Sequence, residues 1–277
     1  HKRGGVPAPA AFRRGIRVVE ALVAAILLIL VLEWALGFSF FDPGFWSAFV
    51  APSEGQSRFL RGFQGTAYFS LLVIPVGLAI GFFTGWARSS QLRFLRWPAT
   101  VYIEFFRGTP ALILVIFAAL FGILIVRGVN QFEVSLLLGA MALALHTGAY
   151  QAEIFRAGFQ SVPHSQVEAA YSIGMSRAAT MRFVVLPQAL RLSLPPLGNE
   201  FSSVIKDTAL LYAIGATELF GQGLEFSQLA LRTDASWVFP MWVLIAAGYF
   251  LVTFVVTRAV NALERRIRVP GLKGAPV

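Results

Sequence analysis

The chain of 277 residues is 57% hydrophobic and only 13% charged, and its formal net charge is +9. Soluble domains contain roughly 25% charged residues, so this deficit and the long apolar runs place the chain among membrane proteins. It has no cysteine, which excludes a disulfide framework, a thiol nucleophile and a cysteine-ligated metal, and its three histidines are too far apart in sequence to suggest a metal site.

The N-terminal part is interpreted as a basic tail followed by a membrane helix and a loop. Residues 1–16 are predicted to be a flexible tail. No cleavable signal peptide is evident, because the apolar run over residues 16–41 is too long and lacks a convincing cleavage site. Residues 17–62 then hold an extra membrane helix and an outer loop, 39–62, whose aromatic side chains suit the headgroup interface.

Six segments are predicted to be membrane-spanning helices, which makes the chain an all-α integral membrane protein. Each is long enough to cross roughly 30 Å of hydrocarbon at about 1.5 Å per residue. The fifth segment is the most polar, because it contains two prolines, a lysine and an aspartate. The six segments are about 17–38, 64–87, 98–126, 133–157, 188–214 and 236–258.

The distribution of basic residues predicts the orientation of these helices. With the N-terminus in the cytoplasm, the inner segments hold 17 basic residues, the outer loops hold four, and Arg107 and Lys206 fall within the membrane. This asymmetry is typical of membrane proteins and explains the net charge without nucleic acid. Both termini, including the tail over residues 261–277, are expected in the cytoplasm.

Residues 158–187 form the longest cytoplasmic loop of this topology, and they are polar. Ser165 and Glu168 have capping-box spacing, which predicts a short helix. Gly174 follows where a helix end favours a left-handed glycine, and Ser176 is placed to cap a second helix that runs to Pro187. Two helices around a glycine turn suggest three roles: a DNA-binding element, a solvated connector, or a docking element for a cytoplasmic partner. The first is disfavoured because the loop has no room for supporting helices.

The loop also resembles the EAA signature of ABC-importer permeases. Val184 stands where isoleucine is commoner in that signature. Residues 149–219, which begin AYQAEIFRAGFQSVPHSQVEAAYSIGMS, and residues 102–117, YIEFFRGTPALILVIF, are similar to the polar amino-acid branch of the family. The resemblance extends over about residues 63–260, which would be the importer domain, with five core helices in addition to the N-terminal one. The matching residues of the signature are Glu168, Ala169, Ala170, Gly174, Leu186 and Pro187.

The resemblance implies an assembly in which this chain is one subunit. The loop would form coupling helices that sit on two cytoplasmic ABC ATPases, which bind ATP and Mg²⁺. Other implied partners are a second permease subunit, either a copy or a related chain, and an extracytoplasmic substrate-binding protein. The chain itself has no G-x-x-x-x-G-K-[ST] motif, so no cofactor is expected on it. Glu168 either contacts the ATPase or only closes the capping box, and both roles can coexist.

Polar and ionisable residues within the membrane are costly and indicate functional sites. Counted along the predicted helices, residues of the third, fourth and fifth helices reach a similar depth near the midplane, where they would bind a polar amino acid. Pairing of Glu104 with Arg107, or of Asp207 with a neighbouring base, is the alternative, and His146 is either a ligand or a packed side chain. The candidate residues are Glu104, Arg107, His146, Tyr150, Asn199, Ser203, Lys206, Asp207 and Thr208.

The sequence therefore predicts a permease that moves polar amino acids by alternating access, with no covalent chemistry of its own. An ATP-independent channel or secondary transporter is the main alternative, and the coupling loop disfavours it. A membrane-embedded enzyme is disfavoured because no HExxH, GxSxG or carboxylate-metal motif occurs. Within the family, an opine or another modified amino acid remains an alternative substrate.

Overall fold

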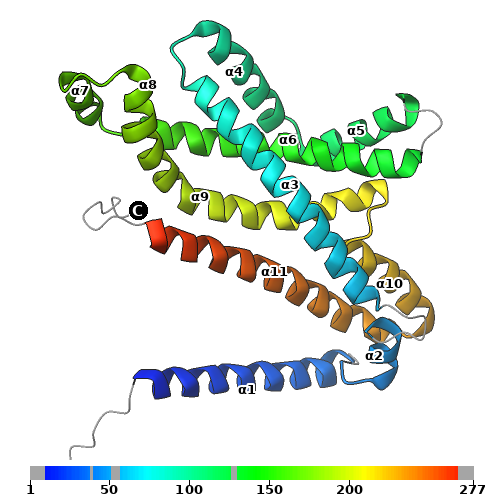
Figure 1. Cartoon of the computed structure of the whole chain (residues 1–277). Coiled ribbons are helices and arrows are strands. Elements are labelled where there is room, and N and C mark those ends of the chain that lie inside the picture. Colours follow the sequence, from blue (N-terminus) through cyan, green and yellow to red (C-terminus); the bar gives the residue numbers. More distant parts are fainter. Residues whose placement is uncertain (1–9, 38–39, 51–56, 126–129, 268–277) are drawn as a thin grey trace, which may run out of the picture.

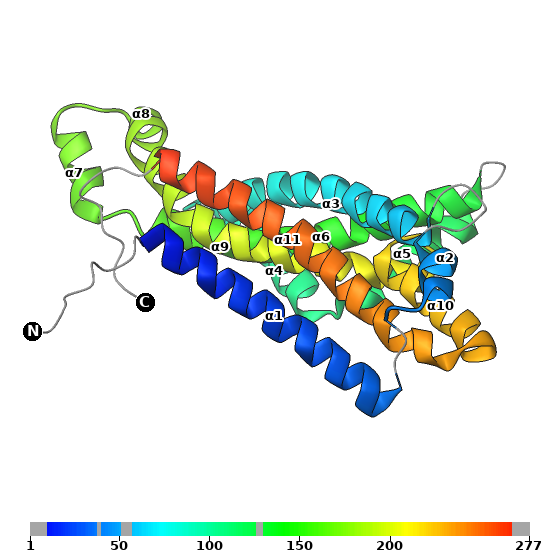
Figure 2. The same cartoon turned by 90° about the horizontal axis from the view of Figure 1, so that it is seen from below.

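The computed structural model describes residues 10–37, 40–50, 57–125 and 130–267, and this part of the chain contains helices and no strand (Figure 1). The all-α prediction is confirmed. The body of the molecule is built from α3 (Arg58–Arg88), α6 (Gln131–Gln160), α9 (Leu186–Asp207) and α11 (Val238–Ile267). The N-terminal helix α1 (Ala10–Leu36) stands apart from this body in both views, and its apolar side chains are largely exposed (Figure 2).

Three helical segments of the described chain are long and apolar enough to cross a membrane: α3, α6, and the segment Ala235–Arg266, which contains most of α11. Two further helices, α4 (Arg93–Gly108) and α5 (Ala111–Ile125), meet the same criterion as a pair. The segment 188–214 is helical, but its prolines and charged residues keep it out of this group. The count of six spanning helices therefore stays a prediction.

The predicted continuous helix over residues 98–126 is wrong, because α4 and α5 meet at a bend of 104°. Thr109 is extended between them, with φ −107° and ψ 132°. A proline disfavours helical geometry in the residue before it and lacks an N–H to continue the helix, so Pro110 accounts for the break. Arg107 lies at the end of α4 beside this bend, and its depth does not follow from counting residues along a straight helix.

Close packing between α3 and α6 forms the centre of the bundle. Gly77, Gly81 and Gly85 recur every four residues on α3 and face the backbone of α6. A Cβ atom at Gly81 would lie 2.7 Å from the Cβ of Gln151 and 3.0 Å from the carbonyl oxygen of Gly148. Small residues allow membrane helices to approach this closely, and the approach fixes α6, which carries the polar side chains described below.

The aromatic residues of the predicted outer loop 39–62 are only partly at the surface, which corrects their assignment to the headgroup interface. A short helix, α2 (Pro43–Phe49), forms there, and Phe45 and Phe49 are fully buried. Both rings pack on Phe226 of α10 (Leu219–Thr233), a helix that lies between the fifth and sixth predicted spanning segments. Residues 51–56 of the predicted loop lie outside the described residues.

Glu218 fixes the start of α10, in a segment outside the spanning helices. Its carboxylate accepts hydrogen bonds from the backbone N–H groups of Phe220 and Gly221 and from the hydroxyl of Tyr249 on α11. Burial raises the pKa of this carboxyl, and the three hydrogen bonds oppose that shift. The side chain therefore joins α10 to α11 at the end of the bundle where α2 lies.

Candidate functional site

The polar loop begins with the short helix α7 (His164–Ser172), which projects from one end of the molecule (Figures 1 and 2). The predicted capping box is wrong: Pro163 is the residue before the helix, and no side chain caps its first turn. The helix begins at His164, so Ser165 lies inside it. The exposed carboxylate of Glu168 has no hydrogen bond or ion pair to the described residues.

The turn after α7 has the predicted geometry. Gly174 has φ +84°, and its N–H donates to the carbonyl of Tyr171 at 2.9 Å, while the N–H of Met175 donates to the carbonyl of Ala170 at 3.1 Å. These two bonds form a Schellman motif. Nothing lies within 4 Å of the position where a Cβ would be, so the backbone angle alone favours glycine here.

The helix after the turn continues far beyond its predicted end at Pro187. Ser176 caps α8 (Arg177–Thr180) by accepting from the N–H of Ala179 at 3.3 Å, as expected. A π-helical turn, η1 (Met181–Val185), joins α8 to α9 without a break, and Pro187 is the second residue of α9. One helical rod thus runs from the exposed loop into the bundle.

A second group of predicted residues lies where α4 meets α6. The guanidinium of Arg107 stands over the ring of Tyr150, 5.3 Å from its centroid. The ring of His146 lies 5.1 Å from that of Tyr150, and its Nδ1 is 2.9 Å from the carbonyl oxygen of Phe106. The structure therefore brings together three of the residues predicted to contact substrate.

The end of α9 adds charge to this group. Asp207 interacts electrostatically with His146 and with Lys206, but it forms no ion pair within 4 Å in the described chain. Asn199 and Lys206 are exposed and Ser203 is half-buried, on the same helix. Thr208 is fully buried, and its hydroxyl donates to the carbonyl of Ile205 at 2.7 Å, so it offers no free donor. We call His146, Tyr150, Arg107, Lys206 and Asp207 the midplane cluster, after the depth that the sequence analysis predicts for them.

Glu200, one residue after Asn199, was missed by the sequence analysis. Its Oε1 accepts a hydrogen bond from Thr147 at 3.0 Å, and Thr147 in turn accepts from the buried Gln151 at 3.1 Å. Glu200 also interacts electrostatically with Asp207. The signal was available, because a carboxylate within a spanning segment is costly by itself.

Glu104 pairs with a residue that the sequence analysis did not consider. Its Oε1 lies 2.7 Å from Nη2 of Arg88, at the end of α3, so the alternative of a pairing with Arg107 is not what the structure shows. Arg88 and Glu104 are 16 residues apart, so the contact depends on how α4 folds back over α3 and α6.

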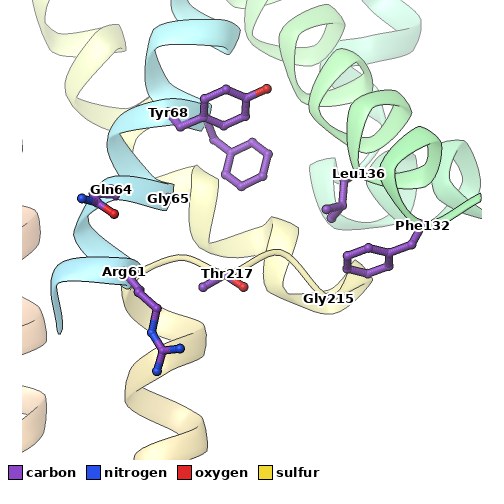
Figure 3. A pocket seen from close by; sticks show the side chains of 9 residues that line it. Arg61, Gln64, Gly65, Tyr68, Phe132, Leu136, Gly215 and Thr217 are labelled. Atoms are coloured by element: carbon purple, nitrogen blue, oxygen red, sulfur yellow. The ribbon is translucent and has the colours of Figure 1, made fainter. Parts of the chain in front are cut away.

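A separate pocket of about 400 Å³ opens at the opposite end of the bundle from α7. Figure 3 shows Tyr68 of α3 and Phe132 of α6 on either side of it, with Gly215 and Thr217 of the turn after η2 (Thr208–Ile214) at its base. The lining is mostly apolar and includes none of the residues predicted to bind substrate.

Comparison with known proteins gives a family match. The family described as "Binding-protein-dependent transport system inner membrane component" matches residues 74–269. The chain is 37% identical over 207 residues to the L-cystine transport system permease protein TcyB of Bacillus subtilis, covering 74% of this chain and 85% of that one. It is 34% identical over 211 residues to the glutamine transport system permease protein GlnP of Escherichia coli K12, covering 76% and 93%.

Solved structures give the same picture. A structure described as an amino acid ABC transporter with histidines is 34% identical, with a TM-score of 0.61, and the match covers 76% of this chain and 94% of that one. The MetNI methionine ABC transporter in an inward-facing conformation has a TM-score of 0.62 at 19% identity, covering 76% and 96%, and so shows a shared fold only.

Proposed function

The chain belongs to the family of inner membrane components of binding-protein-dependent transport systems, and from this premise we propose that it imports polar amino acids as the permease subunit of an ATP-driven transporter. The two permeases named above transport cystine and glutamine. ATP and Mg²⁺ are bound by two cytoplasmic ATPase subunits, since this chain has no phosphate-binding motif. An extracytoplasmic binding protein delivers the substrate.

The observation that carries the proposal is the unbroken helical rod from Arg177 to Asp207. Its first end adjoins the Gly174 turn and α7, which are exposed and projecting, as a docking element for an ATPase must be. Its other end carries Lys206 and Asp207 of the midplane cluster. Closure of the ATPases on α7 would therefore move the substrate site through a single helix.

The midplane cluster supplies partners for both charges of a free amino acid. Arg107 and Lys206 are exposed donors for the carboxylate, and Asp207 is an acceptor for the ammonium group. Removing either charge from water is unfavourable unless such partners replace the water. Glu104 and Thr208 are left out of this assignment, because the first is bound to Arg88 and the second to its own helix.

Exposure of the cluster supports a second permease subunit. Arg107, Tyr150, Asn199 and Lys206 are exposed on the single chain although they belong to predicted membrane segments. Polar groups within a membrane face a partner helix or an aqueous passage rather than lipid. We therefore propose that a second permease, a copy or a related chain, covers this side and completes the passage.

The position of the loop supports an orientation of the chain in the membrane. The first residues of α1 and the last residues of α11 lie at the same end of the molecule as α7 (Figures 1 and 2). We assign this end to the cytoplasm, with the termini, in agreement with the excess of basic residues.

Gly174→Val tests the coupling role. A β-branched residue in the left-handed region costs roughly 1–2 kcal/mol or more, which opposes the turn. The permease should still insert, but co-purification with the ATPase should weaken and binding-protein-dependent uptake should fall at least roughly tenfold, the ratio that 1.4 kcal/mol gives. Gly37→Val is the matched control, because Gly37 has φ +69° and equally open surroundings at the end of α1.

Normal assembly and uptake in Gly174→Val would refute the coupling role. Glu168→Gln is a companion variant, because the structure gives this carboxylate no capping bond to lose. Loss of uptake there points to a charged contact with the ATPase rather than to a change in α7.

A further inference from the structure

Arg88, the last residue of α3, bonds to carboxylates on two other helices. Its Nη1 lies 2.6 Å from Oε1 of Glu153 on α6, and its Nη2 lies 2.7 Å from Oε1 of Glu104 on α4. The two terminal nitrogens of a guanidinium are held in one plane, so a single arginine fixes both carboxylates in a defined geometry. Three helices therefore meet at one side chain.

Both carboxylate oxygens of Glu153 contact arginines. Its second oxygen, Oε2, accepts from Nε of Arg156 at 2.9 Å and lies 2.8 Å from Nη2 of the same arginine. Only 18% of the Glu153 side chain and 20% of that of Arg88 are exposed, against 60% for Glu104. The Arg88–Glu153 pair is therefore the more buried part of this network. The bond from Arg88 to Glu104, here called the Arg88 arm, connects the pair to α4.

This arm lies one helical turn from the midplane cluster. Glu104 precedes Arg107 by three residues on α4, and Glu153 follows Tyr150 by three residues on α6, so each pair shares a helix face. Helix α4 also makes direct polar contacts with α6. The hydroxyl of Tyr102 donates to the carbonyl of Leu145, and the carbonyl of Phe106 lies next to His146. The hydroxyl of Tyr150 donates to the carbonyl of Arg107.

The opposite face of α4 gives it little support from within the chain. Phe94, Trp97 and Phe105 are 71%, 71% and 56% exposed. The helix also ends at the bend before Pro110, so α5 does not continue its axis. The angle of α4 against α6, and with it the place of Arg107, therefore depends on a few contacts, of which the Arg88 arm is the charged one.

We propose that Arg88 is a positioning residue for the substrate site: through Glu104 and Glu153 it holds α4 on α6 and so keeps Arg107 where the carboxylate of the substrate binds. Arg88 itself does not touch the substrate. This role rests on the proposed import function, since it acts through a residue assigned to the substrate. It also explains the charges of Glu104 and Glu153 without a contact between either residue and the amino acid.

The test uses the complete transporter, with its ATPases and binding protein, in lipid vesicles. Arg88→Ala and Glu104→Ala should each raise the KM for amino-acid uptake about tenfold while the maximal rate and the yield of complex change less than about twofold, because binding geometry is lost and coupling is not. Arg88→Lys keeps the charge without the planar fork and should give an intermediate KM. Arg93→Ala, an exposed arginine at the start of α4, is the control and should leave the KM unchanged.

A structural measurement decides the same point without transport. The chain has no cysteine, so spin labels can be placed at Val101 of α4 and Ala157 of α6, both exposed. Their distance distribution should be narrow in the parent chain and broader in Arg88→Ala and Glu104→Ala. Unchanged distances, or a KM that rises in Arg88→Ala but not in Glu104→Ala, would overturn the role. A parent complex that imports no amino acid refutes the import function instead, and the distances still decide whether Arg88 positions α4.

Discussion

Asp207 carries a charge at the end of α9, close enough to His146 and Lys206 to interact electrostatically with both. If Asp207 were the buried partner of another charged residue, its replacement would leave that charge uncompensated, at a cost of several kcal/mol. The described chain contains no ion pair of Asp207, which favours a role in binding over a role in holding the fold.

We therefore expect Asp207→Asn to leave the yield of intact complex and its basal ATP hydrolysis unchanged, and to lower uptake per complex about tenfold at low substrate concentration. Asp234→Asn is the control, because Asp234 is an exposed carboxyl that accepts hydrogen bonds from Ser236 next to α11. Loss of the assembled complex in Asp207→Asn would instead show a structural partner, and unchanged uptake with unchanged affinity would remove Asp207 from both roles.

Packing between elements can be tested at the α3–α6 contact. A Cβ added at Gly81 meets the Cβ of Gln151 and the backbone of α6, and overpacking of this kind costs typically 1–3 kcal/mol. Gly81→Ala should therefore lower the thermal unfolding temperature of the purified permease. Gly108→Ala, at an open position at the end of α4, should not lower it, and an equal shift in both variants would show that the contact is not close.

Elements differ in how much of them the sequence could predict. The Gly174 turn and the Ser176 cap were correct because their hydrogen bonds join residues at most five positions apart. Pro110 marks the break in the helix predicted over residues 98–126, but the 104° angle depends on how α4 and α5 pack. The predicted end of a helix at Pro187 is wrong, because the π turn before the proline keeps the helix continuous.

The orientation of the whole molecule is open to direct measurement, because the chain has no cysteine of its own. Single cysteines at Ser172 on α7 and at Thr233 at the end of α10 should react with a membrane-impermeant reagent from opposite sides of the membrane. Ser172 should react from the cytoplasmic side only. Reaction of both positions from one side would overturn the proposed topology, most directly at α9.

Side-chain contacts between distant parts of the chain could not be predicted from the sequence. Phe45 and Phe49 look like residues of a headgroup interface until Phe226 is brought against them. Glu104 lies three residues from Arg107, which made that pairing plausible, yet the end of α3 supplies its partner. The family and its coupling loop are readable because the signature is continuous in sequence, whereas the midplane cluster is assembled from three helices.

The continuous rod from Arg177 to Asp207 has a consequence for how sequences of this kind can change in length. Adding one residue to an α-helix rotates everything beyond it by about 100° and advances it by about 1.5 Å. An insertion within α9 before Asn199 would therefore turn Lys206 and Asp207 away from His146 while leaving the loop in place. The π-helical turn η1 has more residues per turn than an α-helix, and the connection at Asp234 is not helical. Insertions and deletions should accumulate in segments like these during divergence, and the stretch between Pro187 and Asp207 should keep its length.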